Sequence, residues 1–95
     1  MADLRADIQN ALTYIEENLT EELEIRDIAK KAFLSPFYFQ RIFGVMCGIS
    51  VGEYIRGRRL SLAGEELARS DAKVIDIAAK YGYDSPDSFN RAFQR

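Results

Sequence analysis

The sequence predicts an all-α protein made of two helix-turn-helix subdomains joined by a long linker helix. Apolar residues recur at helical spacing along almost the whole chain, and no useful length alternates apolar with polar residues, so strands are not expected. A motif of a short helix, a tight turn and a second helix occurs twice, about 50 residues apart. The 95 residues suffice for one small domain, or for two half-size subunits that share a core.

The first half combines one helix with the first helix-turn-helix unit. Asp3 is a suitable N-cap for a helix over about residues 4–18. The first unit covers about residues 25–46, and Ser35-Pro36 starts its second helix, because serine caps an orphan N–H and proline lacks one. We expect the buried stripe of that second helix to be Phe39, Ile42, Phe43 and Met46.

The second half follows the same plan. Ser50 and Glu53 form a capping box that starts a linker helix over about residues 51–69. The second unit covers about residues 74–95, and its second helix, which starts at Ser85-Pro86, runs to the end of the chain. The expected inward residues of this unit are Ile77, Ala78, Tyr81, Phe89, Ala92 and Phe93.

The two units correspond residue by residue. Asp27-Ile28-Ala29 recurs as Asp76-Ile77-Ala78, 49 residues later. After the turn the offset becomes 50, so that Ser35-Pro36 recurs as Ser85-Pro86. The second turn is therefore one residue longer than the first.

The outward faces of the two second helices point to the reading of DNA bases. Each carries an amide and a guanidinium one residue apart, and these groups can pair with adenine and guanine in the major groove. A solvated helix face is the ordinary alternative for any one of these residues, but the same pair in the same slot of both units favours the DNA interpretation. Phe37 packs either on thymine methyls and sugar edges or on a neighbouring helix. The outward stripes are Phe37, Gln40, Arg41 and Gly44, and Asp87, Asn90, Arg91 and Gln94.

The linker helix sets the separation of these two faces. Its 19 residues span roughly 28 Å at ~1.5 Å per residue. Such a rod can hold the two faces about one DNA turn apart, near ~34 Å. Arg56, Arg58 and Arg59 cluster on this helix and either reach phosphates or, for Arg58, pair with acids at the core interface. Gly57 and Gly64 inside the helix indicate a close helix–helix approach.

Composition narrows the function classes. The net charge is −2, but residues 1–34 carry four basic and eight acidic residues, and residues 35–95 carry nine and seven. The acidic first third is compatible with DNA binding if it faces away from the duplex. Without histidine or a glycine-rich phosphate loop, we predict no enzyme, no cofactor and no metal site, and we expect the lone Cys47 to be a small buried hydrophobe. No signal peptide or transmembrane segment is present, so we expect a cytoplasmic protein without membrane contact.

Over about residues 5–95 the chain resembles the DNA-binding module of the AraC/XylS family of bacterial transcription regulators. The resemblance implies a homeodomain-like pair with seven helices, of which the third and sixth enter adjacent major grooves. The matching residues are Asp27-Ile28-Ala29, Ser35-Pro36, Phe39-Gln40-Arg41-Ile42-Phe43, Gly48-Ile49-Ser50, Tyr54-Ile55, Arg58-Arg59-Leu60 and the more specific Ile77-Ala78-Ala79-Lys80-Tyr81-Gly82-Tyr83-Asp84-Ser85-Pro86 with Phe89-Asn90-Arg91-Ala92-Phe93.

The resemblance also assigns roles to residues. It implies base contacts by Phe37, Tyr38, Gln40 and Arg41, and by Asp87, Ser88, Asn90 and Arg91. The candidate phosphate contacts are Ser35, Ser50, Arg56, Arg59, Ser85 and Arg95.

Three features depart from the family pattern. The family module continues into a seventh helix, so we expect residues 1–95 to lack the final helix. The segment from Gly44 to Gly48 carries no charge, although it is usually basic in the family. Phe33 stands where the second turn has Gly82, and a left-handed phenylalanine is strained, so we expect the first turn to have a different shape.

The resemblance implies partners beyond DNA. The module starts near Met1, as in Rob-like regulators, whose C-terminal domain binds a small-molecule effector; such a domain would lie after Arg95. RNA polymerase is a further candidate partner, through the acidic face of the first helix. The alternative function is an acidic helical protein-interaction module that does not bind DNA.

Overall fold

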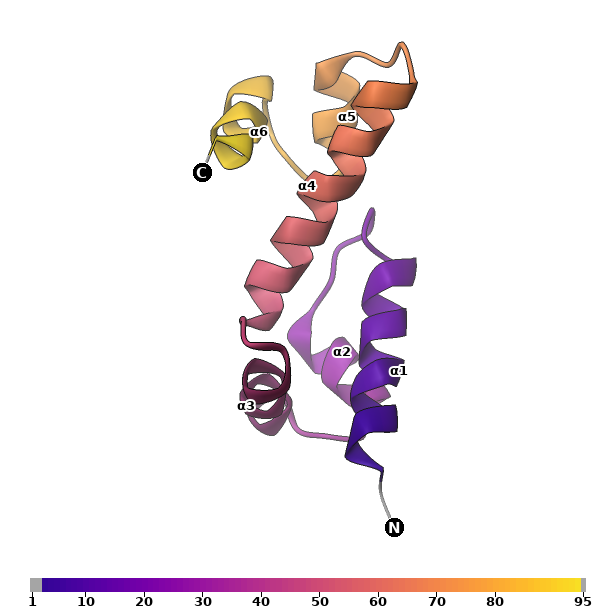
Figure 1. Ribbon diagram of the computed structural model, residues 1–95, viewed down its shortest axis with the longest axis vertical. Helices are drawn as coiled ribbons and strands as arrows, with labels where there is room; N and C mark the ends of the chain where they lie inside the picture. The colour runs from indigo at the N-terminus through magenta and orange to yellow at the C-terminus, as the bar shows by residue number, and fades with distance from the viewer. Residues whose placement is uncertain (1–2, 95) are drawn as a thin grey trace.

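The computed structural model describes residues 3–94 and places two units on a shared central helix (Figure 1). The first unit has the three helices before the central helix, and the second unit has the two helices after it. The predicted all-α architecture is confirmed for these residues. The molecule is elongated, 49 × 22 × 19 Å, and α4 runs along much of its length between α3 at one end and α5 at the other. The elements are α1 (Leu4–Glu17), α2 (Ile25–Lys31), α3 (Pro36–Cys47), α4 (Val51–Arg69), α5 (Val74–Lys80) and α6 (Pro86–Phe93).

Side-chain caps define four of the helix starts, as the sequence predicts. Asp3 accepts hydrogen bonds from the N–H groups of the first turn of α1, and Ser35 and Ser85 do the same for α3 and α6. Ser50 Oγ accepts from Glu53 N at 3.1 Å, which is the first half of the predicted capping box. The second half differs, because the Glu53 carboxylate accepts the Ser50 hydroxyl at 3.2 Å instead of the backbone N–H.

Two separate apolar cores lie on opposite ends of α4. The first core is the larger, and α4 contributes Val51 and Ile55 to it. The second core is built around Ala63 of α4, and Leu62 packs against both cores. The buried residues of the first core are Ile8, Ala11, Ile15, Leu19, Ile28, Ala29, Ala32, Phe39, Phe43, Val51 and Ile55, and those of the second are Ala63, Ile77, Ala78, Tyr81 and Phe89.

The expectation that the first turn has a different shape is wrong. Phe33 adopts a left-handed backbone with φ 57°, and Gly82 occupies the equivalent position with φ 88°. Both turns close with the same two bonds, from Leu34 N to Ala29 O and Phe33 N to Lys30 O in the first unit, and between the corresponding atoms in the second. This is the Schellman arrangement, which satisfies the last carbonyls of α2 and α5. The fold therefore keeps the turn in spite of the backbone strain at Phe33.

Other packing expectations also need correction. Met46 is 45% exposed and Cys47 is exposed, because the last turn of α3 runs past the first core. In α6, Phe93 is 45% exposed although we expected it to face inward. The close approach predicted from the linker glycines is confirmed at Gly64, where an added Cβ would lie 3.3 Å from the Phe93 ring, and wrong at Gly57, where nothing lies within 4 Å.

None of the helices described in residues 3–94 is long and apolar enough to cross a bilayer.

Candidate functional site

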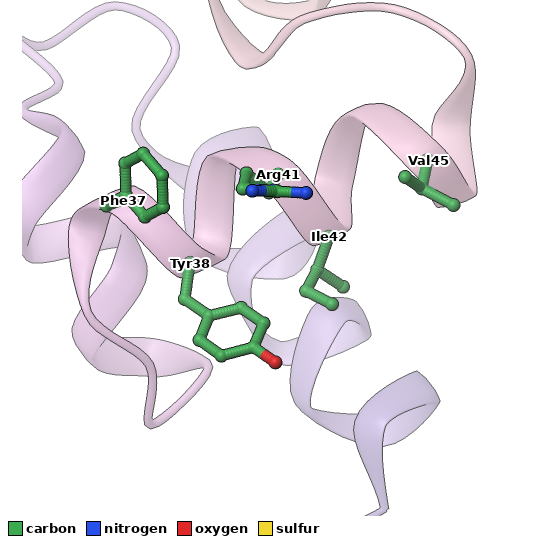
Figure 2. Close-up of a pocket in the computed structure, with 5 residues that line it drawn as sticks. All are labelled: Phe37, Tyr38, Arg41, Ile42 and Val45. Atoms are coloured by element: carbon green, nitrogen blue, oxygen red, sulfur yellow. The ribbon is translucent and has the colours of Figure 1, made fainter.

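The outward face of α3 is apolar to an unusual degree. Phe37 is 70% exposed, Tyr38 58% and Val45 85%, although large apolar side chains on a short surface helix normally find a packing partner. Together with Arg41 and Ile42 they line a shallow hollow of about 480 Å³ (Figure 2). The N-cap at Ser35 and Pro36 at the first position start the helix and thereby fix which side chains face outward.

The polar groups on α3 are few and adjacent. The Arg41 guanidinium carbon lies 5.8 Å from the centre of the Phe37 ring, a cation–π distance that holds the arginine against the aromatic face. Gln40 is exposed, and its Nε2 donates to the backbone carbonyl of Pro36 at 3.2 Å, which leaves its carbonyl oxygen free. Phe37 is 70% exposed, so a neighbouring helix covers little of its ring in this structure.

The equivalent face of α6 is polar. Asp87, Asn90 and Arg91 are exposed, while Phe89 between them is buried. Asp87 takes the position that Phe37 has in α3, four residues before the arginine. Ser88 is half-buried, and its hydroxyl donates to the backbone carbonyl of Ser85 at 3.0 Å. The two faces therefore share an amide and an arginine. They differ in the residue four positions before the arginine, which is Phe37 in α3 and Asp87 in α6.

The helices α3 and α6 lie on the same side of the molecule (Figure 1). In Figure 1, α3 and α6 are at the left of the view, α1 is at the right, and α5 is at the top beside the end of α4. Both α3 and α6 are seen close to end-on, so that their axes run near the viewing direction. The linker helix α4 has the 19 residues expected of it. This arrangement allows α3 and α6 to contact the same elongated ligand.

The candidate phosphate contacts fall into two groups. Ser35, Ser50 and Ser85 are the N-caps of α3, α4 and α6, where backbone N–H groups and the helix dipole favour an anion. Arg56 is exposed on α4 and has no ion-pair partner within residues 3–94. Arg95 lies outside the described residues.

The other two linker arginines make contacts within the chain. Arg58 pairs with Glu16 of α1 at 2.9 Å, so the pairing alternative considered for it is confirmed. Arg59 Nε donates to the carbonyl of Leu19 at 2.9 Å, and its Nη2 to that of Glu21 at 2.7 Å. Both arginines therefore join α4 to α1 and to the loop that follows it.

Two carboxylates are held in charged form by such contacts. The hydrogen bond from Arg58 lowers the pKa of Glu16, and that from Lys80 lowers the pKa of Glu66. Each carboxylate also accepts a tyrosine hydroxyl, from Tyr54 at 3.0 Å and from Tyr81 at 2.7 Å respectively. These contacts join α1 to α4, and α4 to the end of α5.

Sequence reasoning missed two residues of the α3 hollow, Ile42 and Val45. Ile42 was assigned wholly to the core, and it is half-buried there and also lines the hollow. Val45 lies eight residues after Phe37 and four after Arg41, so the helical spacing of these three residues was the signal that could have identified it. No sequence signal could have identified the contacts of Arg59, because its partners are backbone carbonyls.

Comparison with known proteins gives consistent matches. A sequence profile described as "Helix-turn-helix domain" matches residues 28–95. The Transposon Tn10 TetD protein of Escherichia coli is 41% identical over 87 residues, and the HTH-type transcriptional activator AarP of Providencia stuartii is 42% identical over 87 residues. Each match covers 92% of this chain but only 63% and 64% of those two relatives. Regulatory protein SoxS of Escherichia coli K12 is 40% identical, over 93% of this chain and 82% of that protein.

Solved structures give the same fold. An AraC-type transcriptional regulator from Chromobacterium violaceum matches with a TM-score of 0.88 at 23% identity, over 95% of this chain and 80% of the other. The DNA-binding domain of AdpA, solved in complex with a target DNA, matches with a TM-score of 0.83 at 25% identity, over 94% of this chain and 80% of the other.

Proposed function

Because this chain belongs to the AraC/XylS family of helix-turn-helix regulators, we propose that it binds double-stranded DNA sequence-specifically and regulates transcription. In this proposal α3 and α6 enter two adjacent major-groove segments on one side of the duplex. The observation that carries it is the pair of exposed faces, each with an amide and an arginine at equivalent positions, on two helices that both lie at the left of the view in Figure 1. AdpA, whose domain has the same fold at 25% identity, was solved in complex with a target DNA.

The two faces support different kinds of base contact. On α6, Asn90 and Arg91 have the donor and acceptor pattern that pairs with adenine and guanine edges, and Asp87 can accept from cytosine. On α3, Gln40 and Arg41 offer the same polar pair, and Phe37 and Tyr38 add apolar surface that fits a thymine methyl group. Ser88 supports the start of α6 through its bond to Ser85 and lies at the edge of this face.

Phosphate contacts would fix the register of the protein on the duplex. The N-termini of α3, α4 and α6, capped by Ser35, Ser50 and Ser85, offer backbone N–H groups for this purpose. Arg56 is the arginine of α4 whose guanidinium is best placed for a phosphate, since it is exposed and has no carboxylate partner within residues 3–94.

Selection from a random duplex library tests the proposal. We expect enrichment of sites with two short sequence elements about one helical turn, ~10 bp, apart. Binding of all duplexes with equal affinity, or no retention at low salt, would contradict it and would favour the acidic protein-interaction module.

We propose four further properties in addition to DNA binding. The protein acts by binding DNA and not by catalysis. Its location is the cytoplasm of a bacterium, where the chromosome lies. Contact with RNA polymerase would involve the acidic α1, which lies on the side of α4 away from α3 and α6 in Figure 1. A small-molecule effector would act through a domain outside these 95 residues.

A further inference from the structure

Arg59 links the middle of α4 to the first unit by two hydrogen bonds. Its guanidinium donates to the carbonyl of Leu19 at 2.9 Å and to that of Glu21 at 2.7 Å. Both carbonyls belong to the loop after α1, where backbone acceptors have no partner within the helix. Because the guanidinium is a rigid planar fork, two bonds to one loop fix the orientation of α4 more firmly than a single ammonium could.

These bonds lie between the buried apolar residues at the start of α4 and the partly buried Leu62, which packs against both cores. The buried residues that α4 gives to the first core, Val51 and Ile55, are in its first two turns. One turn later, Arg58 pairs with Glu16 and Arg59 reaches the loop, so that polar contacts extend the attachment toward the second unit.

Beside these bonds, the partly buried Leu62 is the α4 residue that packs against both cores among the described residues. A hollow of about 290 Å³ separates the loop from Leu19 to Glu22 from the end of α5, and Arg59 lies at its edge. The second unit is built on the far half of α4, around Ala63. The angle between α4 and the first unit therefore decides where α6 lies relative to α3.

We propose that Arg59 is a positioning residue that sets the tilt of α4 against the first unit and thereby the spacing between the DNA segments read by α3 and α6. This rests on the proposed function. The helix is roughly 28 Å long at ~1.5 Å per residue, so a tilt of about 10° around its first turn moves its far end by about 5 Å. That exceeds the ~3.4 Å rise of one base pair. Loss of the two bonds should therefore relax the preference for one half-site spacing.

Arg56 provides a matched control. It lies on the same helix, three residues earlier, and is exposed without a recorded hydrogen bond to the first unit within the described residues. If an arginine only contacts phosphate, its replacement weakens binding equally at all half-site spacings. The slope of log K against log salt concentration then falls in magnitude by about 0.9. If it positions α4, its replacement changes the ratio of affinities between spacings and leaves the salt slope unchanged.

The first measurement needs no DNA. Spin labels at Asn10→Cys in α1 and Ala68→Cys in α4, both exposed positions, report the angle between these helices by their distance distribution, in a Cys47→Ser background. We expect a broader or shifted distribution for Arg59→Ala and no change for Arg56→Ala. An unchanged distribution in Arg59→Ala would overturn the proposal. The distance distribution does not depend on DNA binding. Failure of the proposed function would therefore be seen in a different measurement, as the absence of specific DNA binding by the unmodified protein.

The second measurement compares affinities for the selected site and for the same site with one base pair inserted between its halves. For Arg59→Ala the ratio of the two affinities should fall toward one, while for Arg56→Ala it should stay at the value of the unmodified protein. An equal loss on both probes with a reduced salt slope would identify Arg59 as a phosphate contact and overturn the proposal. Arg59→Lys, which keeps the charge and loses the fork, should also lower the ratio, and it provides the test if Arg59→Ala does not fold.

Discussion

At the scale of single residues, the two outward faces are equivalent in position and different in chemistry. Phe37 lies against the Arg41 guanidinium, whereas Asp87 occupies its place before Arg91. An exposed aromatic ring contributes favourably to the binding free energy when it covers apolar surface. A carboxylate contributes favourably when it accepts hydrogen bonds. The α3 face should therefore depend on thymine methyl groups, and the α6 face on polar base edges.

Replacement of thymine by deoxyuracil, which removes only the methyl group, tests this difference. In the element read by α3, the replacement should weaken binding by about 0.8 kcal/mol per buried methyl, because that apolar area returns to water. The loss should be much smaller for Phe37→Ala, which has no ring to cover the methyl. The same replacement in the element read by α6 is the control. Equal losses for the unmodified protein and Phe37→Ala would show that the ring does not contact a thymine.

The environment of Tyr81 predicts a loss of stability in alkaline solution. Burial, together with the hydrogen bond to Glu66, raises the pKa of Tyr81 from 10.0 to about 12. The folded protein therefore holds this proton more tightly than the unfolded chain. The corresponding stability is complete below pH 10.0 and is lost as the pH rises toward about 12.

Urea unfolding at a series of pH values from neutral to alkaline measures this loss. Tyr81→Phe has no ionisable group at this position, so its stability should fall less steeply above pH 10.0 than that of the unmodified protein. Parallel curves for the two proteins would contradict the assignment, since other tyrosines would then account for the whole decrease.

At the scale of the elements, the two glycines of α4 make a matched pair. An added Cβ at Gly57 meets nothing within 4 Å, whereas one at Gly64 lies 3.3 Å from Phe93. Alanine stabilises a helix interior by about 1 kcal/mol relative to glycine. Gly57→Ala should gain close to this amount in thermal unfolding, and Gly64→Ala should gain less or lose stability, because the Phe93 ring must shift. An equal gain for both variants would show that α6 does not pack closely on α4.

Local signals account for the parts of the fold that the sequence could predict. Asp3, Ser35 and Ser85 cap backbone N–H groups that are two or three residues away in the sequence, so the sequence alone indicates these caps. The structure has a helix start at each of them. The shape of the first turn could not be predicted in this way. There the hydrogen bonds that end α2 outweigh the strain of a left-handed Phe33.

Long-range geometry accounts for what the sequence could not predict. Met46 continues the stripe of Phe39 and Phe43 in sequence, but the core ends before the last turn of α3. Arg59 looked like Arg56 in the sequence, and only the position of the loop after α1 distinguishes them. The outward stripes were predictable, because the buried apolar positions of α3 and α6 leave the opposite face of each helix exposed, although on α3 that face is largely apolar.

At the scale of the whole molecule, the central feature is that one chain presents two helices to one side. A pair of separate cores on a shared helix gives each outward helix its own support, so each can contact its DNA segment without the other. This predicts that the contributions of the two faces to specificity are separable along the site.

The most direct test of the account is the sequence preference of Arg41→Ala and Arg91→Ala, each measured by selection from the same duplex library. Each substitution should cost about 1–3 kcal/mol on the specific site and relax base preference in one of the two elements. The two variants should relax different elements, about one helical turn, or ~10 bp, apart. Uniform weakening on all duplexes, or loss of preference in the same element for both variants, would contradict the account.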